Sequence, residues 1–179
     1  MKKTAALLLL LLTVCAVSAA AAQSVEIYRE DSQFYIQVTL PSGARVESNT
    51  ADETLSMTEL SYITEGKPSV VITAAPDETY VGMNLSDLTK EEVDLIVSEI
   101  TMEMAAPDVE IRKTPGGHEY IVCNESTQTN DASDTVMLVN GYFIMVHVFY
   151  PDNRELSAED MNIAPSIVES IQFVGNTNS

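Results

Sequence analysis

The sequence predicts an α+β domain in which an antiparallel sheet is covered by helices on both faces, an α/β/α sandwich. Residues 135–150 form a β-hairpin pattern that is apolar on both faces, which is typical of a central, covered ribbon. A capped amphipathic helix precedes this hairpin, and several runs of alternating apolar and polar residues precede the helix. We expect a signal peptide over residues 1–22, one α+β domain over residues 23–174 and a disordered tail over residues 175–179.

The first 22 residues have the layout of a secretory signal peptide. Lys2 and Lys3 give it a basic start, residues 5–17 are apolar, and small residues lead to a cleavage site after Ala22. An uncleaved anchor is an alternative, but the apolar stretch is short for a span of roughly 20 residues. Lipid attachment at Cys15 is another, although the residue before such a cysteine is ordinarily small and here is valine. We expect a secreted or extracytoplasmic protein, with the lipoprotein as the lesser alternative.

The composition is strongly acidic but sufficient for a core. The chain has 27 Asp and Glu against 9 Lys and Arg, a formal net charge of −18. Such a surface repels phosphate backbones and anionic lipids, so we expect neither nucleic-acid nor peripheral-membrane binding. Leu, Ile, Val and Phe make up about a quarter of residues 23–179, above the roughly 20% that marks disordered chains. If Cys15 leaves with the signal peptide, Cys123 remains alone and no internal disulfide forms.

The strand signals are short runs with a period of two. They predict strands at residues 25–29, 34–40, 44–47, 60–63, 70–73, 110–113 and 118–123. The first two are joined by a polar turn and form an opening hairpin. The polar segments at residues 48–58 and 124–133 are expected to be loops.

A long helix is predicted over residues 90–104. Thr89 is a suitable N-cap, and Glu92 three residues later completes a capping box. The apolar residues then recur at helical spacing, as one continuous stripe: Val93, Ile96, Val97, Ile100 and Met104.

The clearest local signal is the hairpin at residues 135–150. Asn140 and Gly141 separate two apolar runs, and this pair favours a two-residue type I′ turn because both positions need a positive φ. The turn fixes the register: the numbers of opposed residues should sum to 281, which places Asp134 beside His147.

A second helix closes the domain. Ser157 is its expected N-cap, with Asp160 as box partner, and a helical apolar stripe runs on to Phe173. Pro165 should either kink this helix or restart it at its own first turn, where proline is tolerated.

The order of these elements resembles the PsbP-like domain, the α/β/α sandwich of the extrinsic photosystem II protein, the Ran-binding Mog proteins and many exported bacterial proteins. Phe34, Ile36 and Val38 with the turn at residues 41–43 resemble its opening strand, and residues 170–173 resemble its closing element. The tryptophan common in the opening segment of such domains is absent. The resemblance implies a non-enzymatic module that binds or scaffolds a partner, and it assigns no site residue.

One group of residues carries the ingredients of catalysis: Cys123, Asp134 and His147. A thiol, an imidazole and a carboxylate can act as nucleophile, general base and orienter. The hairpin register pairs Asp134 with His147, but nothing in the sequence brings Cys123 to them. The alternative is structural, with a buried Cys123 and a His147 held by Asp134. His118, next to two glycines, is expected to be an exposed loop residue.

Two further groups of residues are weaker candidates for a functional site. Asn130, Asp131 and Asp134 lie close in sequence and offer oxygen ligands for weak calcium binding, but we prefer the interpretation as a solvated polar loop. The acidic side of the first helix, Glu91, Glu92, Glu99 and Glu103, offers a surface for a basic partner or simply confers solubility.

These observations favour a secreted or cell-surface binding or accessory domain without enzymatic activity. We expect no cofactor and no metal, and a partner that is a protein or a cell-wall component of unknown identity. The alternative is an exported cysteine-dependent hydrolase that uses Cys123 and His147.

Overall fold

The computed structural model describes residues 23–28, 34–52, 57–102, 104, 107–125, 132–152 and 154–175. Several segments and residues discussed above lie outside these ranges: the expected signal peptide with Cys15, the first polar turn, Glu103, Asn130, Asp131 and residues 176–179. No helix in the described part of the chain is long and apolar enough to cross a membrane.

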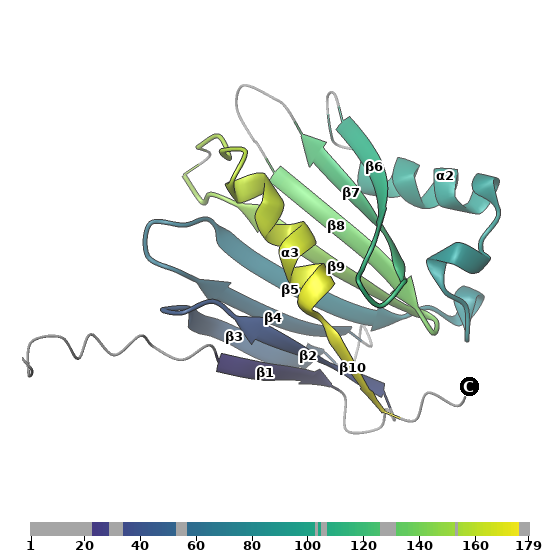
Figure 1. The fold of residues 1–179 in the computed structure, drawn as a ribbon, viewed down its shortest axis with the longest axis horizontal. Helices are drawn as coiled ribbons and strands as arrows, with labels where there is room; N and C mark the ends of the chain where they lie inside the picture. Colours follow the sequence, from purple (N-terminus) through teal and green to yellow (C-terminus); the bar gives the residue numbers. More distant parts are fainter. Residues whose placement is uncertain are drawn as a thin grey trace, which may run out of the picture.

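The strands form two antiparallel sheets (Figure 1). The small sheet has the order β1 (Gln23–Tyr28), β2 (Phe34–Leu40) and β10 (Gln172–Gly175). The large sheet has the order β3 (Arg45–Asp52), β4 (Met57–Ile63), β5 (Ser69–Pro76), β9 (Tyr142–Phe149), β8 (Ala132–Val139), β7 (Glu119–Glu125) and β6 (Pro107–Lys113).

The β8–β9 hairpin lies in the middle of the large sheet, with the predicted register. Each pair of opposed residues sums to 281, and Asp134 faces His147. Asn140 and Gly141 take φ values of 52° and 79°, as a type I′ turn requires. The prediction of a central ribbon is confirmed because β7 and β5 pair with its two outer edges.

One face of the large sheet carries the main core. Helix α3 (Ile163–Ser170) packs across this face, and β2 of the small sheet packs beside it (Figure 1). The side chains that β2, β4, β5 and β9 turn toward this face are almost fully buried, among them Ile36, Leu60, Ile72 and Val146.

The opposite face is covered only in part, so the expectation of helices covering both faces is not confirmed. The helix α2 (Lys90–Ile100) and the 3-10 turns η1 (Glu78–Tyr80) and η2 (Leu85–Asp87) pack on the β7–β8 side, around Ile121 and Leu138. Over β9, Met145 stays 37% exposed. An apolar strand face indicates a tendency to be covered, but it does not specify how far a single 11-residue helix extends across it.

Strands extend into both ends of the two segments that were expected to be loops. β3 continues to Asp52 and β4 begins at Met57, although residues 48–58 were expected to be irregular. β3 is an edge strand with polar residues toward both faces, so it lacks the apolar alternation that identifies a strand. β7 likewise extends to Glu125, and β8 begins at Ala132.

The first predicted helix starts where it was expected but ends earlier. The Thr89 backbone N–H donates to Glu92 Oε2 at 2.8 Å, so the capping box is confirmed. α2 ends at Ile100 instead of near Met104, since the chain must leave the helix before β6 begins at Pro107.

The closing helix restarts at Ile163, after a 3-10 turn η3 (Asp160–Asn162), and Pro165 sits in its first turn. The apolar stripe does not continue as helix to Phe173. The chain leaves α3 after Ser170 and becomes β10, which ends on Gly175, the first residue of the expected tail.

Candidate functional site

The predicted contact between Asp134 and His147 is present. His147 Nδ1 and Asp134 Oδ1 lie 2.6 Å apart across the β8–β9 ladder. The hydrogen bond to the carboxylate raises the pKa of His147 above its usual value, and burial opposes this only in part. The imidazole also stacks at a tilt on Phe149, with 4.8 Å between ring centroids.

Cys123 lies on the same row of the sheet but on the other side of Asp134. The register pairs Cys123 with Asp134 and Asp134 with His147, so the carboxylate stands between the thiol and the imidazole. The thiol and imidazole are two strands apart, about 10 Å at the usual strand spacing. A nucleophile needs its base within hydrogen-bond distance, so this geometry gives no support to the hydrolase alternative.

The electrostatic environment of Cys123 also gives no support to the hydrolase alternative. Its side chain is completely buried beneath the α2 layer. Burial, with a further contribution from the Asp134 carboxylate, raises the pKa of the thiol to about 11. A reactive cysteine has a lowered pKa instead, because the thiolate is the nucleophile.

The remaining candidates are placed as follows. His118 is half-buried rather than exposed, because its ring packs edge-on against Phe173 at 5.1 Å. Glu91 and Glu99 are exposed on α2, whereas Glu92 is held by the capping box. No three acidic, histidine or cysteine side chains gather at a metal-binding distance in the described ranges. Asp134 bonds His147, and its proposed calcium partners are outside those ranges.

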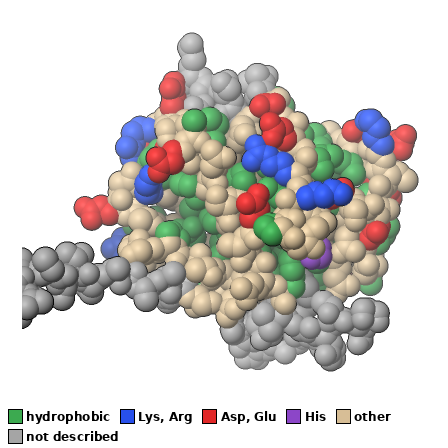
Figure 2. All heavy atoms as spheres, viewed as in Figure 1, with side chains coloured by type: hydrophobic (Ala, Val, Ile, Leu, Met, Phe, Trp, Pro, Cys, Tyr) green, Lys and Arg blue, Asp and Glu red, His purple; other side chains and the backbone are tan. Residues whose placement is uncertain are grey.

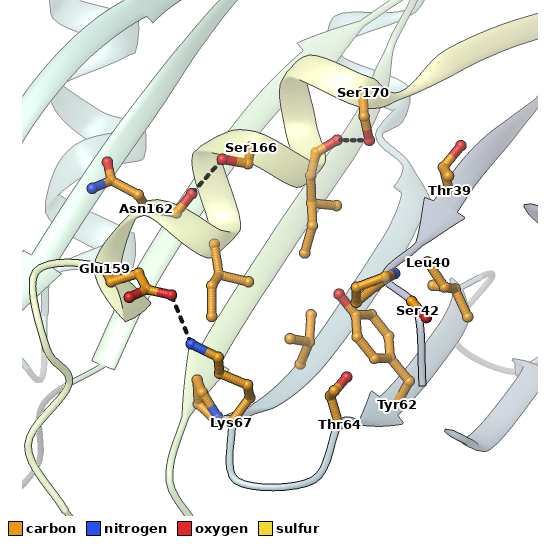
Figure 3. Close-up of a pocket in the computed structure, with 15 residues that line it drawn as sticks. Thr39, Leu40, Ser42, Tyr62, Thr64, Lys67, Glu159, Asn162, Ser166 and Ser170 are labelled. Atoms are coloured by element: carbon orange, nitrogen blue, oxygen red, sulfur yellow. Dashed lines mark hydrogen bonds and ion pairs between the residues drawn. The ribbon is translucent and has the colours of Figure 1, made fainter. Parts of the chain in front are cut away.

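A cavity of about 700 Å³ opens between α3, the end of β2 and the turn that joins β4 to β5 (Figure 3). Its apolar wall is built from the main core and includes Leu40, Val70, Ile163 and Ile167. Hydroxyl groups interrupt this wall, contributed by Thr39, Ser42, Tyr62, Thr64, Ser166 and Ser170. A mostly apolar concavity with a few placed polar groups is typical of a small-molecule site.

Two of these hydroxyls lie on the wall opposite α3, and Figure 3 shows both turned toward the cavity. Thr64 Oγ1 is buried and has no hydrogen-bond partner among the residues that the structure describes. Tyr62 is 2% exposed, and desolvation raises its pKa to about 12. The phenol is protonated at physiological pH, as tyrosine ordinarily is, and can donate a hydrogen bond.

An ion pair closes one end of the cavity. Lys67 Nζ, in the β4–β5 turn, lies 2.7 Å from Glu159 Oε1, just before η3 (Figure 3). On the α3 side, the Ser166 hydroxyl donates to the Asn162 carbonyl at 2.7 Å, and the Ser170 hydroxyl donates to the Ile167 carbonyl at 2.8 Å. The charges of the ion pair offset each other, and they are the only charged side chains that line the described cavity.

The large sheet separates this cavity from the Cys123 row. Val70 lines the cavity, whereas its neighbour Val71 points to the other face, where it pairs with His147. Sequence reasoning missed the cavity because its wall comes from β2, the β4–β5 segment and the region of α3, which are distant in sequence. The only local signal was the presence of Ser and Thr near the ends of apolar runs, as at Thr39, Ser42 and Thr64.

Comparison with known proteins gives a structural match alone. No protein-family model matches the sequence, and no curated protein matches it. Among solved structures, cyanobacterial PsbP (CyanoP) from Synechocystis sp. PCC 6803 is similar, with a TM-score of 0.51 and 11% sequence identity. The match covers 88% of this chain and 95% of that one. The chain therefore has a PsbP-like fold.

Proposed function

We propose that the protein is an extracytoplasmic accessory domain that acts by binding and performs no catalysis. The observation that supports this most strongly is the separation of the two candidate sites by the sheet. The cavity able to hold a molecule lies on the α3 face, and the thiol and imidazole lie on the other. A molecule in the cavity thus meets hydroxyls and an ion pair, without a nucleophile and base in contact.

The location and the kind of partner follow from the sequence. The signal-peptide pattern of residues 1–22 favours export. The net charge of −18 favours a partner with basic groups, either a protein of the cell exterior or a cationic wall component. Figure 2 shows acidic and basic side chains interspersed on the α3 face, so we do not assign the basic partner to that face.

Binding to immobilised protein tests this function. Extracellular proteins and wall fragments are applied at about 0.01 M and about 0.15 M ionic strength, between which the Debye length falls from about 30 Å to about 8 Å. We expect a retained partner that is released at the higher salt, equally with wild-type protein and with Cys123→Ala. Turnover of ester, thioester or amide substrates that Cys123→Ala abolishes would contradict the proposal.

A further inference from the structure

We propose that the cavity under α3 binds a neutral, largely apolar small molecule that carries a hydrogen-bond acceptor such as a carbonyl group. This inference rests on the proposed function, a domain that acts by binding, and it adds the chemical class of one ligand. The volume of about 700 Å³ lies within the roughly 300–1,000 Å³ of small-molecule sites.

The acceptor is inferred from the two hydroxyls turned into the cavity. A buried hydroxyl without a partner is unfavourable, and nearly all such groups in folded proteins are paired. Thr64 Oγ1 is buried and lacks a partner within the described residues, and it lines the cavity together with Tyr62. A ligand carbonyl placed between them would accept from both donors.

The neutral character is inferred from the charges. An anion would meet a protein of net charge −18, and the one lining cation, Lys67, is already paired with Glu159. A cation would find no unpaired carboxylate in the lining. Burial of an unpaired charge against the apolar wall is costly, so both kinds of ion are disfavoured.

The apolar character is inferred from the wall. Leu40, Val70 and Ile167 belong to the buried core and still form part of the cavity surface. Contact with this wall removes apolar surface of the ligand from water, which is the main favourable contribution to its binding.

The test is a fluorescence titration of the purified protein with Nile red, a neutral apolar dye that carries a carbonyl group and brightens in apolar surroundings. The key variant is Thr64→Val, which keeps the shape of the side chain and removes the hydroxyl. Its matched control is Thr135→Val, because Thr135 Oγ1 is also buried and unpartnered in the described part, but Thr135 does not line the cavity. Ser166→Trp, at an exposed helix position on the rim, places an indole across the opening.

We expect saturable binding of one dye per protein. Thr64→Val should weaken it about fivefold to tenfold, as loss of one neutral hydrogen bond does, whereas Thr135→Val leaves it unchanged and Ser166→Trp abolishes it. A neutral dye without a carbonyl, N-phenyl-1-naphthylamine, should bind Thr64→Val and wild type alike. Thermal unfolding shows that each variant is folded, and Thr64→Val should be no less stable than wild type, so lost stability cannot explain lost affinity.

Three outcomes would overturn the inference: no saturable binding of Nile red, binding that both Thr64→Val and Ser166→Trp leave intact, or equal weakening by Thr64→Val and Thr135→Val. Any of these leaves salt-sensitive capture of a partner standing. Cys123-dependent turnover would contradict the proposed function whatever the dye does. Failure of the ligand inference can therefore be distinguished from failure of the proposed function.

Discussion

The tip of the β8–β9 hairpin is held by close contact between backbones, and Gly141→Ala should disrupt it. A Cβ added at Gly141 would lie 2.9 Å from the Tyr80 carbonyl oxygen and 2.9 Å from Val81 Cα. Both are backbone atoms that cannot rotate away. The Gly141 N–H also donates to the Met83 carbonyl at 2.8 Å, and the Gly141 carbonyl accepts from Asp77 N–H at 2.9 Å.

The cost has two parts, and a second glycine separates them. Gly141 has a φ of 79°, and alanine in this left-handed region costs about 1–2 kcal/mol. The displaced tip would also weaken two backbone hydrogen bonds, each worth about 1 kcal/mol. Gly43 has a φ of 82° but no atom within 4 Å of an added Cβ, so Gly43→Ala carries the first cost alone.

Equilibrium unfolding in urea measures the difference. With a urea slope of about 2 kcal/mol/M, Gly141→Ala should lower the midpoint by about 1.5 M and Gly43→Ala by about 0.5 M. Unchanged slopes would show that both variants unfold from a similarly compact state. Equal midpoint shifts in the two variants would refute the docking of the hairpin tip against residues 80–82.

Three further predictions concern buried polar groups. Because the folded pKa of His147 is raised, its stabilising contribution is complete below the unfolded pKa of about 6.5 and is lost as pH rises through the folded value. The free energy of unfolding, measured against pH, should therefore fall over this range, and Asp134→Asn should flatten this pH profile. A pH profile that Asp134→Asn leaves unchanged would contradict the pairing of the two residues. Cys123 should resist iodoacetamide near pH 8 in the folded protein and react once urea unfolds it, as mass spectrometry can follow; rapid labelling of folded protein would contradict its burial. Tyr120→Phe should lower the free energy of unfolding by about 1 kcal/mol, as measured by thermal unfolding, because it removes the 2.6 Å hydrogen bond to Glu169. The Glu169 carboxylate is exposed and regains a hydrogen bond to water. A loss well above about 1 kcal/mol would show that the packing of the ring had also changed.

The β8–β9 hairpin could be predicted in register because one dipeptide controls it. Asn140 and Gly141 specify the turn, and the turn specifies every pair out to Ala132 and Phe149. The contact between Asp134 and His147 followed from this local rule alone. The start of α2 was predictable for a similar reason, because its cap is a local contact.

Features that depend on distant segments were not predictable. β10 is four residues long and begins one residue after α3, so in the sequence its apolar residues continue the apolar stripe of the helix. Only pairing with β2, more than 130 residues earlier, makes it a strand. The cavity depends on the same long-range packing, here of α3 against β2, and no single run of sequence contains its wall.

The central claim is that the protein binds a small molecule in the cavity on the α3 face of the sheet, and not at the row of Cys123, Asp134 and His147 on the other face. Mapping of backbone amide chemical shifts during titration with Nile red tests it most directly. We predict shifts at Tyr62, Thr64 and along α3, with the amides of Cys123 and His147 unmoved. Shifts centred on Cys123 and His147, with α3 unaffected, would contradict the account.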